Sequence, residues 1–330
     1  MSLIGYHASH EQFTPRELLG FARQAERAGF DAAMCSDHFH PWSEAQGQSG
    51  HAWTWLGSAM AATQLPYAVV NCPVGRYHPA VIAQAVATLL QMHGDRFTLI
   101  AGSGEALNEA ITGARWPPKD VRNRRLQSAV EVMRALWRGE EVTHRGSDDE
   151  GFVVERARLY SLPENLTPKV FVAALSPETA RWAASWADGL ATISMPRDKL
   201  QEVVDAFREG GGDGKPLWLQ VKLSYAGSDD EALRGAHAQW RTNVMKGEVS
   251  EELRTPAQFE AAAELVKPED MRDAVRVSAD AQRQLDWLQE DAALGFERLF
   301  LHNVNRGQQR FIDDFGARVL PELRRARPAA

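Results

Sequence analysis

Short apolar runs alternate with amphipathic stretches along most of the chain. The runs have the continuous hydrophobic character of strands buried on both faces, and the stretches repeat apolar residues at helical spacing. The pattern predicts strands at residues 3–7, 31–35, 67–72, 97–101, 170–174, 189–193, 217–223 and 298–302. It predicts helices at residues 15–28, 52–62, 79–93, 121–137, 177–186, 198–208, 229–241 and 308–323.

Residues at the boundaries support these helices. Thr14 and Pro15 have the order of an N-cap followed by a proline in the first turn, and Gly29 stands where the helix should end. Eight strands, each followed by a helix, indicate an α/β fold of the closed parallel (β/α)8 type, the TIM barrel. A doubly wound open sheet is the main alternative, because local patterns do not show closure.

Two stretches interrupt the alternation. Residues 140–162 are charged and then β-like, and residues 246–270 are acidic and helical. Both are interpreted as insertions, the second between the seventh and eighth strands. With no linker or low-complexity segment, we expect one domain over residues 1–330.

Composition narrows the class of partner. The chain is 44% hydrophobic and 25% charged, which is ordinary for a soluble globular protein. A formal net charge of −7 argues against nucleic acid or an anionic membrane as the main partner. Cys35 and Cys72 both lie in apolar runs, which favours buried free thiols and a cytoplasmic location.

The chemistry should lie where the strands end, because a parallel barrel builds its active site from loops at the carboxyl ends of its strands. The loop after the second predicted strand is the richest, since Asp37 could orient His38 as a general base and Trp42 offers a flat apolar wall. A structural loop is the alternative. His38 and His40 also have the His-x-His form of barrel metallohydrolases, a weaker hypothesis because clear further ligands are missing.

Other strand ends supply weaker signals. Gly102-x-Gly104-Glu105 indicates either a tight turn or close approach of the backbone to a planar ligand, with Glu105 and Asn108 as polar groups. Ser176 could expose backbone N–H groups to a phosphate or simply cap a helix. The remaining strand-end candidates are His7, Ser9, Glu11, Gln12, Arg76, Tyr77, His78, Ser194, His302 and Asn303. Arg122, Arg124 and Arg125 form a basic cluster on one predicted helix, which is interpreted as solvated surface, with phosphate binding as the weaker alternative.

Several motifs occur together in order, at residues 4–6, 29–31, 36–42, 76–84 and 102–109, and again at 222–225 and 300–302. With this order and spacing the chain resembles the luciferase-like monooxygenase superfamily, in particular the deazaflavin-dependent glucose-6-phosphate dehydrogenases and a related subgroup of probable FMN-type oxidoreductases. The resemblance runs nearly end to end. It implies a luciferase-like TIM barrel, a bound flavin or deazaflavin, a small-molecule substrate and a homodimer.

The resemblance also implies roles for individual residues. Asp37 and His38 match the active-site pair, Trp42 the wall on the substrate side, and Glu105 the acid beside the cofactor ring. A non-proline cis peptide is expected near residues 69–71. Cofactor contacts are expected from Asp37, Cys72, Ser103, Gly104, Glu105, Asn108, Ala173, Ala174, Leu175 and Ser176.

Departures from the family pattern change which substrate and which cofactor we expect. Pro196 and Ala274 stand where the sugar-phosphate dehydrogenases carry cations for the substrate phosphate, although Arg272 and Arg276 lie near. Glucose 6-phosphate is therefore not the expected substrate. Leu175-Ser176 replaces a glycine pair near the cofactor tail, which favours FMN over coenzyme F420.

The expected function is thus an oxidoreductase acting by hydride transfer or monooxygenation on an unknown small organic substrate. A catalytically idle flavin-binding barrel is an alternative from another class, and a barrel metallohydrolase is a weaker one. Intact Asp37, His38 and Glu105 argue against the idle protein.

Overall fold

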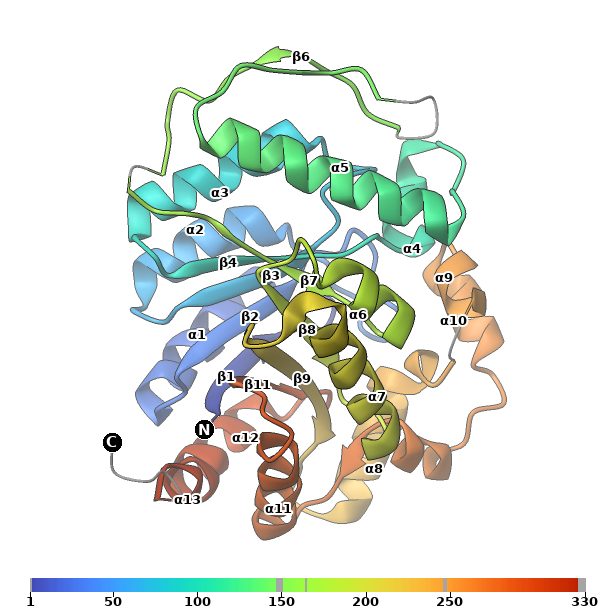
Figure 1. Ribbon diagram of the computed structural model, residues 1–330. Coiled ribbons are helices and arrows are strands. Elements are labelled where there is room, and N and C mark those ends of the chain that lie inside the picture. The colour runs from blue at the N-terminus through green and yellow to red at the C-terminus, as the bar shows by residue number, and fades with distance from the viewer. Residues whose placement is uncertain (1, 147–150, 164, 246–247, 326–330) are drawn as a thin grey trace.

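The fold is seen in a computed structural model that describes residues 2–146, 151–163, 165–245 and 248–325 (Figure 1). Eight strands form a parallel barrel: β1 (Leu3–Ala8), β2 (Ala32–Ser36), β3 (Tyr67–Asn71), β4 (Phe97–Ala101), β7 (Lys169–Ala173), β8 (Gly189–Ile193), β9 (Leu217–Ser224) and β11 (Arg298–Asn303). The barrel closes where β8 pairs with β9, in a register that joins Leu190 to Leu217. The TIM barrel is thereby confirmed and the open sheet is excluded.

Helices surround this barrel and connect one strand to the next. They are α1 (Pro15–Ala28), α2 (Ala52–Ala62), α3 (Pro79–His93), α5 (Lys119–Trp137), α6 (Pro177–Ala183), α7 (Arg197–Phe207), α8 (Asp229–Trp240), α11 (Ala281–Ala292), α12 (Gln308–Asp314) and α13 (Leu320–Arg325). The expected caps are present, because the Thr14 hydroxyl accepts a hydrogen bond from the Glu17 N–H and Gly29 adopts a left-handed conformation with φ 93°. Throughout the described ranges, no helix is both long enough and apolar enough to cross a bilayer.

The sequence interpretation missed two helices, α11 and the short α4 (Ala106–Glu109), extended one helix too far and did not predict an interruption in another. Helix α11, which leads into β11, was not predicted because 229–241 had already been assigned as the helix after the seventh strand. Helix α6 ends at Ala183 rather than at residue 186. The helix expected at 308–323 is divided by a π-helical turn at Phe315–Val319.

Both predicted insertions are present. The first contains an antiparallel pair, β5 (Val142–His144) and β6 (Val154–Ala157); residues 147–150 lie outside the described residues. The second contains α9 (Glu248–Glu252), α10 (Pro256–Ala262) and a 3-10 turn at Pro268–Asp273; residues 246–247 are likewise outside. It is followed by a short strand, β10 (Arg276–Val277), that pairs with the end of β9.

The barrel interior changes character along its axis. Large and small apolar side chains fill its middle, namely Ala32, Met34, Ala68, Ile100, Phe171, Ala191, Trp218 and Phe300. Towards the carboxyl ends the interior becomes polar on β1, β9 and β11, where His7, Gln220 and His302 meet. Because side chains alternate between the two faces of a strand, these polar groups form one side of the floor beneath the loops.

Gly5 tests how tightly the interior is packed. A Cβ at this position would lie 2.3 Å from the Phe300 ring, far inside contact distance. We expect Gly5→Ala to lower the free energy of unfolding by about 1–3 kcal/mol through overpacking. Gly20→Ala is the matched control, because a Cβ there meets nothing within 4 Å. It lies within α1 and should raise the free energy of unfolding by up to about 1 kcal/mol. Urea unfolding of both variants measures the difference, and equal effects would refute the packing argument.

Candidate active site

The parallel strands bring the loops that carry the predicted site residues to one rim of the barrel. Residues 36–42 follow β2, 76–79 follow β3, 102–109 follow β4 and 173–176 follow β7, and all four strands run in the same direction. This is the end at which parallel barrels carry their active sites. Residues widely separated in the sequence therefore share one opening.

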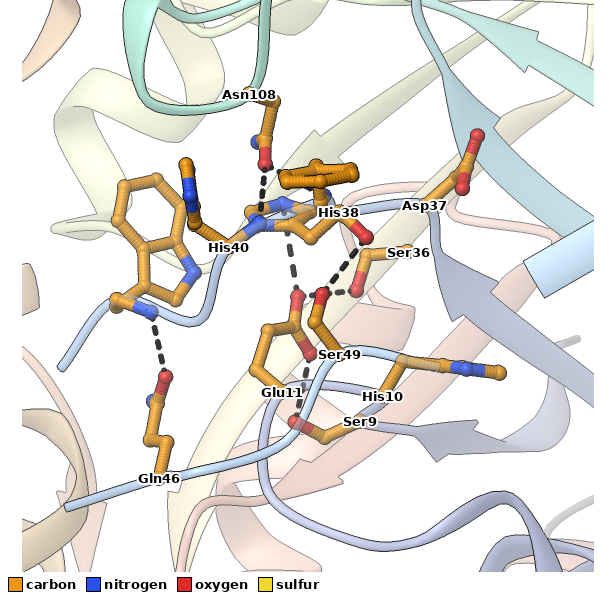
Figure 2. A network of polar contacts seen from close by, with 12 residues as sticks. Ser9, His10, Glu11, Ser36, Asp37, His38, His40, Gln46, Ser49 and Asn108 are labelled. Carbon is orange, nitrogen blue, oxygen red and sulfur yellow. Dashed lines mark hydrogen bonds and ion pairs between the residues drawn. The ribbon is translucent and has the colours of Figure 1, made fainter. Parts of the chain in front are cut away.

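His38 is paired with a carboxylate from the loop that follows β1. Its Nε2 lies 3.5 Å from Glu11 Oε1, and Glu11 also accepts hydrogen bonds from the hydroxyls of Ser36 (2.6 Å) and Ser9 (2.9 Å). Figure 2 shows Glu11 beneath the His38 ring. His38 Nδ1 is buried and has no hydrogen-bond partner within the described residues. A proton held on Nε2 by Glu11 leaves the lone pair of Nδ1 available.

Asp37 does not orient His38, which corrects the sequence-based expectation. Its carboxylate accepts hydrogen bonds from Asn71 Nδ2 (2.8 Å) and the Tyr77 hydroxyl (3.3 Å) and lies 2.9 Å from Arg76 Nη2. In Figure 2 the Asp37 side chain points away from the His38 ring. Adjacent side chains at the end of a strand face opposite sides, so adjacency in the sequence separates these two groups.

Glu11 carries its charge deep inside the barrel mouth. Burial alone would raise the pKa of its carboxyl group, but the charge of His38, the Ser36 hydroxyl and the charge of His7 together lower it to about 2. Glu11 is therefore ionised throughout the neutral range and can stabilise positive charge on the imidazole. The sequence interpretation had placed Glu11 at the rim without assigning it a role.

Arg76 joins two buried carboxylates. Its Nη1 lies 2.9 Å from Glu109 Oε1, while Nη2 contacts Asp37, and its backbone N–H donates to Glu109 Oε2 at 2.8 Å. The guanidinium thereby fixes the ends of β2 and β3 to the short helix α4 (Ala106–Glu109). Its signal in the sequence was the Arg-Tyr-His-Pro motif after the third predicted strand.

The loop bearing His38 is fastened to α4 by further bonds. Asn108 Oδ1 accepts hydrogen bonds from the backbone N–H groups of Phe39 (2.9 Å) and His40 (3.3 Å), as Figure 2 shows. The His40 ring binds the Leu107 carbonyl at 2.8 Å. The oxygen of Asn108, an expected cofactor contact, is thus already used in holding this loop.

Because His38 and His40 bind different partners, they do not converge as the metallohydrolase hypothesis required. In the described part of the chain, no three His, Cys, Asp or Glu side chains cluster in a metal-binding arrangement.

Trp42 forms a wall beside His38. The two rings are 5.1 Å apart between centroids, and Phe259 from α10 packs edge-on against Trp42 at 5.2 Å. The Trp42 backbone N–H donates to Gln46 Oε1 at 2.8 Å. The second insertion therefore supplies the outer layer of this wall.

The carboxyl ends of β3, β4 and β7 present an apolar surface, called the seat below, that is formed by Val70, Gly102 and Ala173. Val70 and Ala173 are partly buried against the barrel interior, and a Cβ on Gly102 would approach Ala173 only to 3.6 Å. Gly104 has φ 81°, and a Cβ there would lie 2.9 Å from the Cys72 sulfur. Glycine is required at that turn because its φ is positive and because a Cβ would collide with the Cys72 sulfur. The expected cis peptide is absent from residues 69–71, because every peptide bond there is trans.

Glu105 borders this seat. Its Oε2 is buried and has no hydrogen-bond partner within the described ranges, and burial raises the pKa of its carboxyl group. An unsatisfied buried oxygen is costly unless a bound molecule supplies the missing partner. Glu105 is therefore suited to meet a polar group of a ligand lying in the seat.

Residues 173–176, the segment expected near the cofactor tail, differ from one another in what their side chains do. The Ser176 hydroxyl caps α6 by accepting from the Thr179 N–H, so the capping alternative is the one observed. Leu175 is 57% exposed, whereas Ala174 is buried.

Arg122 on α5 corrects the interpretation of the basic cluster as solvated surface. Its Nη1 donates to the Gly104 carbonyl at 3.1 Å and its Nε to the Pro117 carbonyl at 3.2 Å, and its side chain is only 4% exposed. Arg122 is therefore a buried charge fixed by backbone groups.

A neutral histidine pair lies on the polar side of the floor. The rings of His7 and His302 are 4.3 Å apart, and Gln220 Nε2 lies 3.1 Å from His302 Nδ1. Burial lowers the pKa of His7 to about 4 and that of His302 well below its ordinary value. His7 Nδ1 is buried without a partner in the described residues. His7 and His302 were among the strand-end candidates of the sequence analysis, whereas Gln220 was missed; period-2 alternation along β9 could have indicated that it faces the barrel interior.

The family model of luciferase-like monooxygenases matches residues 2–298. The chain belongs to this family and is an oxidoreductase. An F420-dependent glucose-6-phosphate dehydrogenase of Microbacterium testaceum is 34% identical, over 98% of this chain and 97% of that protein.

Solved structures agree with the fold. An F420-dependent secondary alcohol dehydrogenase, in complex with an F420-acetone adduct, has a TM-score of 0.88 at 30% identity and covers 97% of this chain and 99% of its own. The coenzyme F420-dependent tetrahydromethanopterin reductase of Methanopyrus kandleri has a TM-score of 0.79 over 97% of this chain and 99% of its own; at 18% identity it bears on the fold alone.

The ionised Glu11 should make folding sensitive to acid. Its pKa falls from 4.5 in the unfolded chain to about 2 in the folded protein, so its contribution to stability is complete above about pH 4.5 and is lost as the pH falls towards 2. That difference corresponds to about 3 kcal/mol. We expect Glu11→Gln to flatten the fall in unfolding free energy between about pH 5 and pH 3, measured by urea titration. Glu131→Gln, an exposed helical control, should leave that slope as it is. Identical slopes in all three proteins would contradict the assignment.

Proposed function

We propose that this oxidoreductase is a dehydrogenase that takes a hydride from an uncharged alcohol and delivers it to coenzyme F420. The observation that carries the proposal is the arrangement of His38. A buried imidazole lies beside an aromatic wall at the barrel mouth, with one nitrogen 3.5 Å from the Glu11 carboxylate and the other without a hydrogen-bond partner among the described residues. An imidazole with an available lone pair is the kind of proton acceptor that alcohol oxidation requires.

The residues present fit a planar redox ring. Val70, Gly102 and Ala173 give an apolar seat, and the Gly104 turn admits close approach of a ring to the backbone. Glu105 directly follows the Gly104 turn, and its buried Oε2 has no hydrogen-bond partner in the part of the chain that the structure describes. When bound, a deazaflavin or flavin ring supplies the hydride acceptor.

Side chains of the protein then take up the proton that the alcohol loses. With Nε2–H directed to Glu11, His38 Nδ1 accepts the hydroxyl proton as the carbon–hydrogen bond breaks and the hydride leaves. Glu11 stabilises the imidazolium that forms, because its carboxylate is already ionised. Trp42 and Phe259 keep water away from the reacting carbon. The products are a ketone or lactone and the two-electron-reduced cofactor.

The choice of F420 over FMN follows from the relatives that share at least 30% identity. Both the sugar-phosphate dehydrogenase and the secondary alcohol dehydrogenase are named as F420-dependent. The substitution at Leu175-Ser176 had favoured FMN, but it is a local difference set against nearly end-to-end similarity to F420-dependent proteins. FMN remains the alternative cofactor.

Charge favours a substrate without a phosphate. Glu11, Glu105 and Glu109 all act electrostatically on His38, so the reacting end of the site is rich in carboxyl groups. Arg276, near one position of the family's phosphate-binding cations, is bound to Asp291 at 2.5 and 2.8 Å, and Arg272 is exposed. The neutral His7 and Gln220 offer hydrogen bonds to hydroxyl or carbonyl groups instead. A dianionic phosphate buried without basic partners is strongly disfavoured.

Cofactor reduction tests this function. Purified protein with F420 should reduce the cofactor on addition of small secondary alcohols or non-phosphorylated sugars, followed by loss of the oxidised deazaflavin absorbance. Glucose 6-phosphate should give a kcat/KM at least about 100-fold lower, because two buried charges then lack partners. Saturable oxidation of glucose 6-phosphate would overturn the substrate class. Reduction of FMN but not of F420 would overturn the cofactor.

His38 should be the proton acceptor and Glu11 its positioning partner. We expect His38→Ala to lower kcat by roughly 100- to 10,000-fold with little change in cofactor affinity. Glu11→Gln should lower kcat less and shift the pH profile of kcat, because the imidazolium loses its counter-charge. Asp37→Asn is the contrasting variant, since Asp37 binds Arg76 and Tyr77 rather than His38. Asp37→Asn should leave the acidic limb of the pH profile of kcat unchanged. His38→Ala with normal turnover and lost cofactor would instead make His38 a binding residue.

A further inference from the structure

A chain of hydrogen bonds starts at two backbone carbonyl groups and runs to the floor of the barrel. Gln12 Nε2 donates to the Val304 carbonyl at 2.7 Å and to Gln239 Oε1 at 3.1 Å. Gln239 Nε2 in turn donates to the Ala45 carbonyl at 3.2 Å. Because a carbonyl oxygen can only accept, both side-chain amides are fixed in orientation. The oxygen of the Gln12 amide is therefore the atom that meets the next member of the chain.

The tautomer of His302 follows from this orientation. Its Nε2 lies 3.2 Å from Gln12 Oε1, which is an acceptor, so this nitrogen carries the proton. Burial lowers the pKa of His302 well below its ordinary value, so the ring is neutral and Nδ1 holds a lone pair. Gln220 Nε2, at 3.1 Å, donates to that lone pair.

The same amide then sets the tautomer of His7. Gln220 Nε2 also lies 3.5 Å from His7 Nε2 and directs its second N–H there, so His7 Nε2 is the unprotonated nitrogen. Burial lowers the pKa of His7 to about 4, so the ring is neutral at pH 7 and its single proton is on Nδ1. Among the residues that the structure describes, this buried Nδ1 has no hydrogen-bond partner. The chain of hydrogen bonds thus ends in a buried N–H donor without an acceptor.

This donor lies near the reacting end of the site. His7 is on the inner face of β1, two residues beyond Gly5 towards the barrel mouth. The charge of Glu11 raises the pKa of His7 and that of His38 lowers it, so the His7 ring is within electrostatic reach of both. Gln220 faces the barrel interior and is nevertheless only half-buried. Solvent, and hence a small molecule, can therefore enter the mouth as far as this part of the floor.

We propose that His7 recognises the substrate by donating its Nδ1–H to a second oxygen atom of the alcohol, an ether, hydroxyl or carbonyl oxygen apart from the reacting hydroxyl group. His7 is then a specificity-determining residue. The inference rests on the proposed function in that the substrate is an uncharged alcohol. A buried donor without an acceptor is costly, so an alcohol whose second oxygen supplies the acceptor is favoured over an alkyl alcohol of the same shape.

Nitrogen NMR tests the tautomers before any substrate is added. The full chain is labelled with isotopically enriched histidine, and correlations between ring protons and ring nitrogens distinguish an Nδ1–H ring from an Nε2–H ring. We expect His7 to be protonated on Nδ1 and His302 on Nε2, with His7→Asn and His302→Gln identifying the two sets of signals. A His7 ring protonated on Nε2 instead would overturn the proposal.

Pairs of alcohols of matched shape test recognition. The pairs are 1-methoxypropan-2-ol with pentan-2-ol and 4-methoxybutan-2-ol with hexan-2-ol, in which an ether oxygen replaces one methylene group. With F420 added, at least one ether should move the His7 Nδ1 signal downfield of its position with the matching alkyl alcohol. The same ether should have a kcat/KM roughly 5- to 50-fold higher than its partner. Equal signals and equal kcat/KM within both pairs would overturn the proposal.

Variants of His7 separate donation from packing. His7→Phe keeps a ring beside His302 but removes the donor, so the ratio of kcat/KM within the favoured pair should fall to about one. His7→Asn can place an amide N–H near the position of Nδ1 and should retain most of that ratio. His93→Phe is the matched control, because His93 also has a buried ring nitrogen without a partner in the described ranges but ends α3, away from the mouth. An unchanged ratio in His7→Phe would exclude donation by His7.

The two readouts distinguish failure of this inference from failure of the proposed function. Reduction of F420 at equal rates by both members of each pair would leave the proposed function standing and overturn the role of His7. An ether-specific shift of the His7 signal without any reduction of F420 would support the role of His7 and overturn the proposed function. Circular dichroism confirms that each variant is folded.

Discussion

Closure of the eight-stranded barrel is the constraint on which the rest of the molecule depends. The pairing of β8 with β9 leaves no free edge in the ring and forces alternate residues of every strand into a narrow interior. Glycine at position 5 makes room for Phe300 in that interior, and Trp218 packs against the same ring. Because all strands point the same way, closure also gathers the loops after β2, β3, β4 and β7. The contact between Glu11 and His38 exists only because β1 and β2 are neighbours in this ring.

The site divides into two halves with different chemistry. The side formed by β3, β4 and β7 is apolar and open at glycines, as a planar ring requires, whereas β1, β9 and β11 present His7, Gln220 and His302. Arg76 then fixes the boundary between them by holding Asp37 and Glu109. The residues that match the family's motifs therefore do not all have the same role. His38 and Trp42 border the site, whereas Asp37 and Asn108 mainly hold the loops in place.

Local sequence signals predicted local structure well. Thr14 and Gly29 marked the ends of α1, because caps act within one turn, and the helix predicted at 79–93 has the bounds of α3. The count of strands predicted the barrel, but closure depends on pairing between strands far apart in the chain and needed the structure. The partner of His38 was missed for the same reason, since Glu11 lies 27 positions earlier in the sequence. Arg76, His7 and His302 were noted at strand ends, yet no local pattern states what such side chains contact.

One insertion contributes to both sides of the mouth. Phe259 on α10 backs Trp42, and Glu251 on α9 meets Arg122 beside the loop after β4, with only a short connection between the two helices. The same short segment of chain therefore borders the mouth at two places, beside Trp42 and beside Arg122. A change in the length of the connection between α9 and α10 would alter both places together, so the insertion tolerates changes of length there less well than an ordinary surface loop does.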